Sequence, residues 1–341
     1  TFHEELGRGA YGVVVKVEAT ESKELFAAKI VNKKALKRIR VGRFGNALQS
    51  TKKELAIWKR FKHRHIVVLH EVIDTEDSDE LYMISELVEG GPVLDGEEEC
   101  TPLSPEQTKL FFCHLIEGLD FLHENKIIHR DIKPGNLLLK KFDDGETVLK
   151  LADFGVSHEM DSDNDTLRQT AGTAIFMAPE MLTGDNFHGK PVDIWACGIT
   201  LYMFVYGHPP FTAKTMTELY RKILNEPIPY PATVGERVVE EDLLDLLQHI
   251  LEKDPAKRYT IPQIRAHRWA WNDFQVSAVK CVTHAEGRRS SFSRVPRSLA
   301  DMVSVGRSLR SIFGRTKPVY PMTSHRGSVG TPTSMQAEPP A

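Results

Sequence analysis

The stretch from Ile128 to Leu138 contains Asp131, Lys133 and Asn136, and Asp153 follows seventeen residues after Asn136. These four side chains fit the needs of phosphoryl transfer to a hydroxyl group. Asp131 can accept the hydroxyl proton, and Lys133 can neutralise charge on the phosphoryl group in transit. Asn136 and Asp153 offer hard oxygen atoms, the ligands that Mg²⁺ prefers. Because several residue types coincide at fixed spacings, we predict a catalytic loop that uses ATP and Mg²⁺, rather than an ordinary loop between strands.

A glycine-rich motif lies near the N-terminus, where Leu6-Gly7-Arg8-Gly9-Ala10-Tyr11-Gly12-Val13-Val14 has the pattern G-x-G-x-x-G-x-V. Dinucleotide-binding folds use the same glycines, but there a helix follows and points its N-terminus at a pyrophosphate. Here the β-branched run Val13–Val17 follows and favours a strand. We therefore predict a β-hairpin whose backbone N–H groups cover the phosphates of ATP, with Val14 against the adenine.

Lys29 lies on the next apolar strand, within Phe26–Ile30, where its ammonium group can reach the α- and β-phosphates. Ala27 is small enough to let an adenine ring lie against that strand. A helix is expected from about Ser50 to Arg60, and its Glu54 is the best partner for Lys29. This pair would hold the lysine on the phosphates, and its separation would mark an inactive state.

The run from Leu81 to Val88 predicts a strand that enters a hinge between two lobes. Backbone groups of Glu86 and Val88 are expected to hydrogen-bond the adenine edge, while Leu138 would form the floor of the pocket. The residues predicted to hold the nucleotide are Leu6, Gly7, Gly9, Gly12, Val14, Ala27, Lys29, Ser85, Glu86, Val88 and Leu138.

The second half of the chain is predicted to be helical. Ser104 and Pro105 have the residue types of an N-cap and a first helical position, and an apolar face follows. We predict an α+β fold with two lobes. Residues 1–87 would form a small antiparallel sheet lobe, residues 88–271 a larger helical lobe, and residues 272–341 a basic, largely disordered tail.

Three further residues of the helical lobe are expected to make specific polar contacts. Asp193 lies near the start of an apolar helix and is predicted to hold the catalytic-loop backbone. Glu180 is predicted to pair with Arg258, and a buried pair of this kind is costly to break from one side.

Composition fits a globular protein, with 41% hydrophobic and 27% charged residues over 341 positions. No apolar run approaches membrane-spanning length, and no signal-peptide pattern opens the chain. Its four cysteines are scattered without disulfide or metal-ligand spacing. We therefore expect a reducing cytosolic location, with the nucleus as the alternative, and no nucleic-acid partner. The chain begins at Thr1 without a Met, so we expect a fragment of a longer protein.

From Gly287 onward the chain has nine Lys or Arg and two acidic residues, a net charge of +7 on an otherwise acidic protein. Apolar residues of 298–315 share one side of a helical wheel, although Arg310 interrupts that side and Gly306 weakens the helix. A basic amphipathic helix is typical of calmodulin targets. Calmodulin is therefore one candidate partner of 298–315, beside autoinhibitory docking and plain disorder.

Residues 1 to about 271 resemble a eukaryotic protein kinase along their whole length. The run from Leu81 to Val93 and Phe176–Glu180 are similar to the calcium/calmodulin-dependent protein kinase kinases. Pro134–Leu139 and Pro255–Arg258 are also similar to liver kinase B. This resemblance implies a serine/threonine kinase whose protein substrate is another kinase, of the AMP-activated or calmodulin-dependent type.

Residues 33–43 are strongly basic, with Lys33, Lys34, Lys37, Arg38, Arg40 and Arg43. The kinase kinases carry an Arg/Pro-rich insertion here, whereas this region is shorter and lacks Pro. Two interpretations remain open, a solvated insertion and a docking patch for an acidic partner.

Three positions bear on substrate choice. Kinases that prefer Arg upstream of the target hydroxyl generally place acids at the positions of Pro92, Gly135 and Met203, and none is acidic here. We therefore predict that the enzyme is not directed by a substrate Arg.

The activation loop also departs from the common pattern. Many kinases place a phosphorylatable Thr four residues before Thr173, where this chain has Gln169. We predict basal activity without loop phosphorylation, with the neighbouring Thr170 not a switch. Thr173 itself is expected to hydrogen-bond Asp131 and Lys133, the arrangement of serine/threonine kinases.

Ser85 occupies the position behind the adenine where the resembling kinases carry a larger residue, and Trp58 lies one helical turn after Glu54. Because cores tolerate volume-conserving exchange better than voids, we hypothesise that the Trp58 indole fills the space that Ser85 leaves. The alternative is an open back pocket.

The sequence thus predicts an upstream serine/threonine kinase with Asp131, Lys133, Lys29 and Glu54 as catalytic residues. Two alternatives remain, a calmodulin-regulated effector kinase and a kinase-fold scaffold without catalysis.

Overall fold

The computed structural model describes residues 1–271 except 10–11, 39, 42–44, 97, 155–156, 161–163 and 168–171. The candidate calmodulin segment 298–315 therefore lies outside the described residues, as do Gln169 and Thr170. Within the part that is described, no helix is both long enough and apolar enough to cross a membrane.

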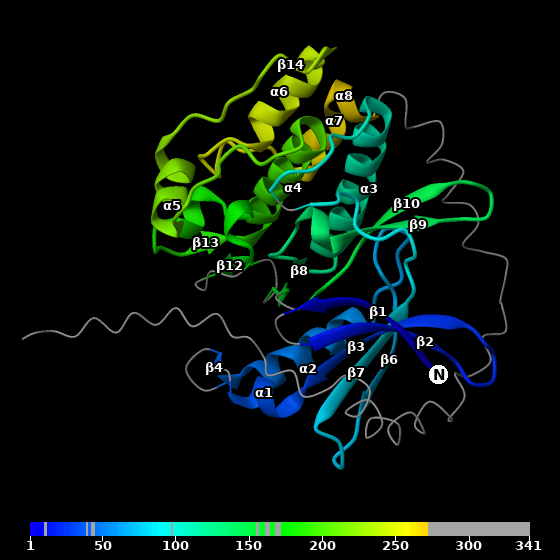
Figure 1. Ribbon diagram of the computed structural model, residues 1–341. Coiled ribbons are helices and arrows are strands. Elements are labelled where there is room, and N and C mark those ends of the chain that lie inside the picture. The colour runs from blue at the N-terminus through cyan, green and yellow to red at the C-terminus, as the bar shows by residue number, and fades with distance from the viewer. Residues whose placement is uncertain are drawn as a thin grey trace, which may run out of the picture. The chain divides into compact units, whose positions relative to one another are not determined.

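An antiparallel sheet forms the N-terminal part of the fold (Figure 1). Within the described ranges its five strands follow the order β1 (Phe2–Gly9), β2 (Gly12–Glu18), β3 (Leu25–Asn32), β7 (Glu80–Glu86) and β6 (Leu69–Asp74). Gly9 pairs with Gly12, which confirms the predicted hairpin between β1 and β2. In β3 the burial alternates, so Ala27 and Lys29 stay accessible while Ala28 is buried.

Two helices connect β3 to β6. The basic insertion folds as α1 (Lys33–Arg38) and a short hairpin of β4 (Arg40–Val41) with β5 (Gly45–Asn46). Helix α2 runs over Ala47–Trp58, so the predicted range of Ser50 to Arg60 was too late at both ends. The start is earlier because the Asn46 side chain caps the helix, accepting a hydrogen bond from the Gln49 backbone N–H at 3.0 Å.

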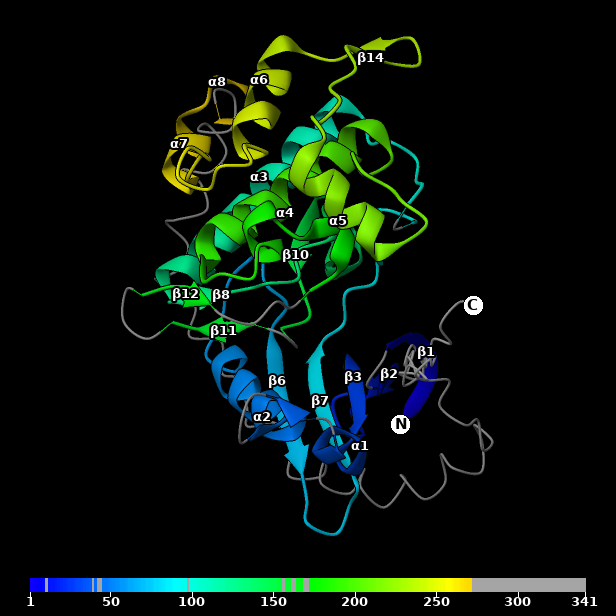
Figure 2. The same ribbon diagram turned by 90° about the vertical axis from the view of Figure 1, so that its left-hand side faces the viewer.

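Helices dominate the C-terminal part, and they gather in one group apart from the sheet (Figure 2). Their bounds are α3 (Pro105–Glu124), α4 (Gly189–Tyr206), α5 (Met216–Asn225), α6 (Glu241–Ile250), α7 (Ile261–Ala266) and α8 (Arg268–Trp271). The predicted start of α3 is confirmed. Ser104 accepts from the Gln107 N–H, the Gln107 side chain accepts from the Ser104 N–H, and Pro105 occupies the first turn.

Short strand pairs and 3-10 turns connect these helices. The pairs are β8 (Ile127–Ile128) with β11 (His158–Glu159), β9 (Leu137–Lys141) with β10 (Thr147–Leu151), β12 (Thr166–Leu167) with β13 (Phe187–His188), and β14 (Thr233–Val234) with β15 (Arg237–Val238). The turns are η1 (Pro134–Asn136), η2 (Ala174–Phe176) and η3 (Pro179–Leu182).

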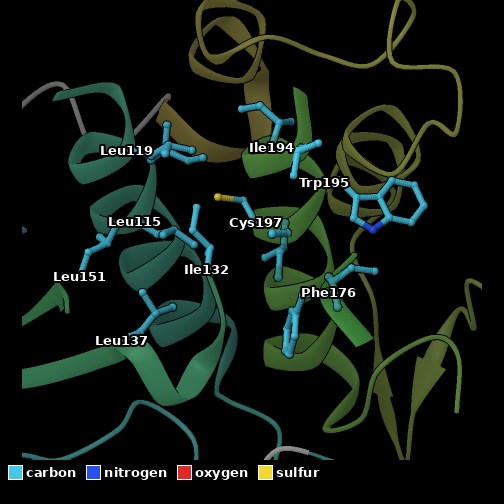
Figure 3. Close-up of a cluster of buried hydrophobic side chains, with 14 of the residues drawn as sticks. Leu115, Leu119, Ile132, Leu137, Leu151, Phe176, Ile194, Trp195 and Cys197 are labelled. Atoms are coloured by element: carbon cyan, nitrogen blue, oxygen red, sulfur yellow. The ribbon is translucent and has the colours of Figure 1, made fainter. Parts of the chain in front are cut away.

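A hydrophobic core lies between α3, α4 and the catalytic loop (Figure 3). Leu115 and Leu119 of α3 are fully buried, as is Trp195 of α4. Ile132 and Leu137 bring the two ends of the catalytic loop into the same core. The catalytic loop therefore packs against apolar side chains of the core, which restricts the motion of its backbone.

The sheet and the helical part meet through backbone contacts near β10. Ile66 forms a parallel bridge with Leu151, and the Val67 N–H donates to the Leu151 carbonyl at 2.9 Å. After β7, Pro92 forms an antiparallel bridge with Leu138 of β9. These contacts place the end of β7 next to the hairpin of β9 and β10.

Candidate active site

The carboxylate of Asp131 is held in one orientation by two neighbours. Its Oδ1 accepts from the Thr173 N–H at 3.0 Å and from the Thr173 hydroxyl at 2.9 Å. Its Oδ2 accepts from the Asn136 amide at 3.0 Å. Asp131 remains partly exposed, so a carboxylate of fixed orientation faces the solvent side of the loop.

Lys133 completes this group. Its ammonium group donates to the Thr173 hydroxyl at 2.8 Å and lies 3.8 Å from Asp131 Oδ2. Thr173 thus bridges Asp131 and Lys133, as the sequence predicted for a serine/threonine kinase. A proton acceptor and a cation lie side by side, which suits attack by a hydroxyl group on a phosphoryl group.

Asn136 and Asp153 flank the hairpin of β9 and β10 and are brought together by it. The Ala152 N–H donates to the Asn136 carbonyl at 2.8 Å. Asp153 follows Ala152 directly, so its backbone lies close to that of Asn136. The Asn136 side-chain amide also donates to the Asp131 carbonyl at 2.8 Å. Since its NH₂ group is committed to Asp131, the Asn136 Oδ1 is the atom that remains for a metal. Together with the Asp153 carboxylate it offers the oxygen ligands that suit Mg²⁺, so these residues fit the predicted cofactor.

Lys29 reaches the same place from the sheet. Its ammonium group donates to Asp153 Oδ1 at 2.8 Å, although 124 residues separate the two in sequence. The predicted partner Glu54 belongs to α2, but its side chain lies outside the described part of the structure, so this pair stays a prediction. A cation in contact with a carboxylate that is predicted to bind metal suits the phosphates of a nucleotide.

The predicted adenine site consists of apolar residues that stay accessible. Val14, Ala27, Val88 and Leu138 are each only partly buried. Val14 lies opposite Lys29 in the sheet. Gly7 and Gly12, which are predicted to line the phosphates, belong to the β1–β2 hairpin, whose tip at 10–11 lies outside the described residues. A half-exposed apolar surface next to a phosphate site suits a purine ring.

The hinge strand is oriented by Glu86. Its N–H donates to the Val68 carbonyl at 2.9 Å, so this N–H is already engaged within the protein. Its carboxylate accepts from Lys140 and from Lys150, both at 2.7 Å. Burial raises the pKa of Glu86, but the bonds from Lys140 and Lys150 outweigh it and the pKa is lowered. The sequence did not reveal this cluster, because its members lie far apart in the chain and show no motif.

Asp193 holds the backbone of the catalytic loop, as predicted. It is fully buried in α4, and its Oδ2 accepts from the His129 N–H and from His123 Nε2, both at 2.9 Å. Its Oδ1 accepts from the Arg130 N–H at 2.8 Å. Arg130 has a φ of 70°, a left-handed conformation that is costly for any residue other than glycine. The two bonds from Asp193 therefore stabilise the strained turn that presents Asp131.

The predicted pair of Glu180 and Arg258 is confirmed. The guanidinium donates to both carboxylate oxygens, at 2.6 Å and 2.9 Å, and the Arg258 side chain is fully buried. The same guanidinium lies 5.1 Å from the centre of the Trp195 ring. This bidentate pair joins η3 to the segment between α6 and α7, and the guanidinium also donates to the Pro191 carbonyl of α4 at 2.8 Å.

Part of the basic insertion is neutralised within the molecule. Lys33 is buried and donates to Asp74 at 2.9 Å, while Lys52 of α2 pairs with the other oxygen of Asp74. Lys34 pairs with Asp79. The basic run therefore presents less free charge to a partner than its sequence suggests. The exposed remainder of α1 fits either a solvated insertion or a docking patch for an acidic partner.

The comparison with known proteins agrees with this geometry. A family model described as "Protein kinase domain" matches residues 1–270. The chain belongs to the protein kinase family. Membership of this family is consistent with the roles predicted for Asp131, Lys133, Asn136 and Asp153 in the catalytic loop and metal site, and for Lys29 at the phosphates, and these roles stay predictions.

Three relatives show the type of kinase. The "Calcium/calmodulin-dependent protein kinase kinase" of Caenorhabditis elegans is 39% identical over 289 residues, covering 79% of this chain and 52% of that protein. "Serine/threonine-protein kinase ssp1" of Schizosaccharomyces pombe is 38% identical, with 78% and 41% covered. "Serine/threonine-protein kinase STK11" of Gallus gallus is 36% identical, with 77% and 58% covered. This kinase is similar to serine/threonine kinases and spans about half the length of these relatives.

Proposed function

We propose that this kinase transfers the γ-phosphate of ATP to a Ser or Thr hydroxyl of a protein substrate. The observation that carries the proposal is the group around Asp131, whose carboxylate is oriented by Thr173 and Asn136 while Lys133 lies beside it. Such a group can orient the attacking hydroxyl and accept its proton. General-base catalysis of this kind contributes about 10²–10⁴ in rate.

Each residue of the site has one task in this mechanism. Asn136 and Asp153 would hold Mg²⁺, which when bound neutralises charge on the nucleotide phosphates. Lys29, held by Asp153, binds the phosphates from the sheet side. Lys133 donates toward the γ-phosphate, and Asp131 takes the proton from the substrate hydroxyl.

The substrate that we propose is the activation loop of another protein kinase, of the AMP-activated or calmodulin-dependent type. The relative from Caenorhabditis elegans bears the name of a kinase that acts on a kinase. The three positions where Arg-directed kinases place acids hold Pro92, Gly135 and Met203, and Met203 is fully buried. A substrate Arg would find no carboxylate at these positions, which favours recognition of a folded substrate over a basic linear motif.

Regulation by calmodulin is the second candidate, because the tail segment 298–315 is basic and amphipathic in sequence. The alternatives to an upstream kinase are a calmodulin-regulated effector kinase and a kinase-fold scaffold without catalysis. A calcium-dependent pull-down of the full chain with calmodulin tests the first. We also propose a cytosolic location, with the nucleus as the alternative, because Cys100, Cys113 and Cys197 are free thiols.

The experiment is phosphate transfer to the inactive catalytic domain of an AMP-activated-type kinase, followed by mapping of the modified residue. We expect one phosphate on the activation loop, dependence on Mg²⁺ and no transfer by the Asp131→Ala variant. Transfer to short Arg-containing peptides, with none to the folded kinase, would refute the upstream role. Equal incorporation by the Asp131→Ala variant would refute the catalytic assignment.

A further inference from the structure

Helix α4 begins without a cap from its own N-cap residue. The side chain of His188, which precedes the helix, makes no capping hydrogen bond. Instead Asp165, 25 positions before Lys190, accepts the Lys190 N–H at its Oδ2 at 3.0 Å. The Asp165 carbonyl also accepts the Gly189 N–H at 2.9 Å. The activation segment therefore supplies the cap of α4 from a distance.

The Asp165 carboxylate is well held in this position. Its Oδ1 lies 2.6 Å from His188 Nδ1, and the residue is buried. Burial raises the pKa of Asp165, but the bonds from the Lys190 N–H and from His188 outweigh it and the pKa is lowered. A carboxylate at the start of an 18-residue helix also interacts favourably with the helix dipole.

Residues next to Asp165 dock on the same surface. Strand β12 pairs with β13, with Leu167 opposite Phe187. Leu167 is buried, and a Cβ placed on Gly189 would lie 3.1 Å from its side chain and 2.7 Å from that of Ile128. A side chain at 189 would have to displace Ile128 or Leu167, so Leu167 packs closely against the start of α4.

The activation segment is also fixed on the far side of 168–171. Gly172 has a φ of 105°, and a Cβ there would lie 2.4 Å from the Arg130 carbonyl. Thr173 follows and binds Asp131. The segment is thus anchored at Asp165–Leu167 and again at Gly172–Thr173, on both sides of residue 169, which is Gln and cannot be phosphorylated.

We propose that Asp165 is the positioning residue that orders the activation segment of this kinase by capping α4. Its side chain supplies a fixed hydrogen-bond acceptor at the contact between segment and helix, so no phosphate at 169 or 170 is needed. Helix α4 also carries Asp193, which holds the catalytic loop, so the cap and the loop are attached to the same helix. The inference rests on the proposed kinase activity.

The test compares Asp165→Ala and Asp165→Asn with the matched control Asp185→Asn, which changes an exposed acid before the same helix. Each full chain is treated with phosphatase, and kcat and KM are measured for ATP and for the folded kinase substrate. For Asp165→Ala we expect kcat/KM for the protein substrate to fall about tenfold, the scale of a lost helix cap, with KM for ATP changed less than about twofold. Faster proteolytic cleavage within 161–171 should accompany the loss.

Asp165→Asn retains an oxygen for the Lys190 N–H and is expected to recover most of the activity, while the Asp185→Asn control keeps all of it. The inference is overturned if Asp165→Ala equals the wild type, if KM for ATP and the thermal midpoint worsen in proportion to activity, or if phosphatase abolishes wild-type activity. A wild-type chain that is inactive before any phosphatase treatment would instead refute the proposed function.

Discussion

Replacing Asp193 by Asn tests the mechanism most directly, because it changes one buried oxygen and almost no volume. Asp193 accepts the N–H groups of His129 and Arg130 with its two different oxygens. An Asn side chain has one oxygen, so one of these N–H groups would face an NH₂ group instead. The His123 ring would also lose a charged acceptor.

The magnitude follows from these lost contacts. A buried donor without an acceptor costs about 1–3 kcal/mol, and hydrogen bonds to a charged group contribute about 1.5–3 kcal/mol. The left-handed Arg130 backbone is strained by about 1–3 kcal/mol, and without both bonds to Asp193 this strain would drive the loop to rearrange. We expect the free energy of unfolding to fall by about 3 kcal/mol. Because Asp131 follows Arg130 directly, a displacement of about 1 Å should lower kcat by about 10².

Urea unfolding at 25 °C and initial rates of phosphate transfer measure the two effects. Asp242→Asn is the matched control, since Asp242 forms an ion pair with Arg268 in which both side chains are substantially exposed. Surface pairs of this kind contribute about 0–1 kcal/mol, so the control should retain stability and kcat. An Asp193→Asn variant with the unfolding midpoint and kcat of the wild type would show that Asp193 does not hold the loop.

Three other predictions concern stability, phosphate binding and the back pocket. Burial lowers the pKa of His65 to about 3 and the pKa of His114 to about 4, so below pH 6.5 the unfolded chain binds protons that the folded chain excludes. Stability should therefore fall by about 2 kcal/mol per histidine between pH 7 and 5, and urea unfolding of His114→Gln should show a shallower pH dependence. Lys29→Met should lower kcat/KM for ATP by about 10² with the thermal midpoint nearly unchanged, and a smaller loss in steady-state rates would contradict its role. If the Trp58 indole fills the space beside Ser85, bulky adenine analogues should inhibit the wild type weakly and Trp58→Leu about tenfold better, whereas potent inhibition of the wild type would support an open pocket.

The Trp58 hypothesis gains one structural detail. The indole N–H donates to the Val67 carbonyl at 2.6 Å, and the ring packs 5.4 Å from that of Phe154. The Ser85 hydroxyl lies 3.4 Å from the Ala27 carbonyl. Trp58 is thus held against Phe154, the residue that follows Asp153.

The chemistry of this kinase could be predicted from the sequence because its catalytic groups are specified by local spacing. Asp131, Lys133 and Asn136 lie within six residues, and a 3-10 turn at η1 brings Asn136 back to Asp131. The start of α3 was predictable for the same reason, since a capping box depends on residues three positions apart. Local geometry of this kind is encoded largely by neighbours in the chain, which is why a sequence pattern can indicate it.

Contacts between distant residues were decided only by the tertiary structure. The sequence contained the charges of Glu86, Lys150 and Asp165, but nothing in their spacing indicated that Glu86 meets Lys150 or that Asp165 caps α4. Each of these bonds joins groups that packing brings within hydrogen-bond distance only after the strands and helices have assembled. The physical reason is that a hydrogen bond depends on distance and direction in space, which a one-dimensional pattern specifies only between near neighbours.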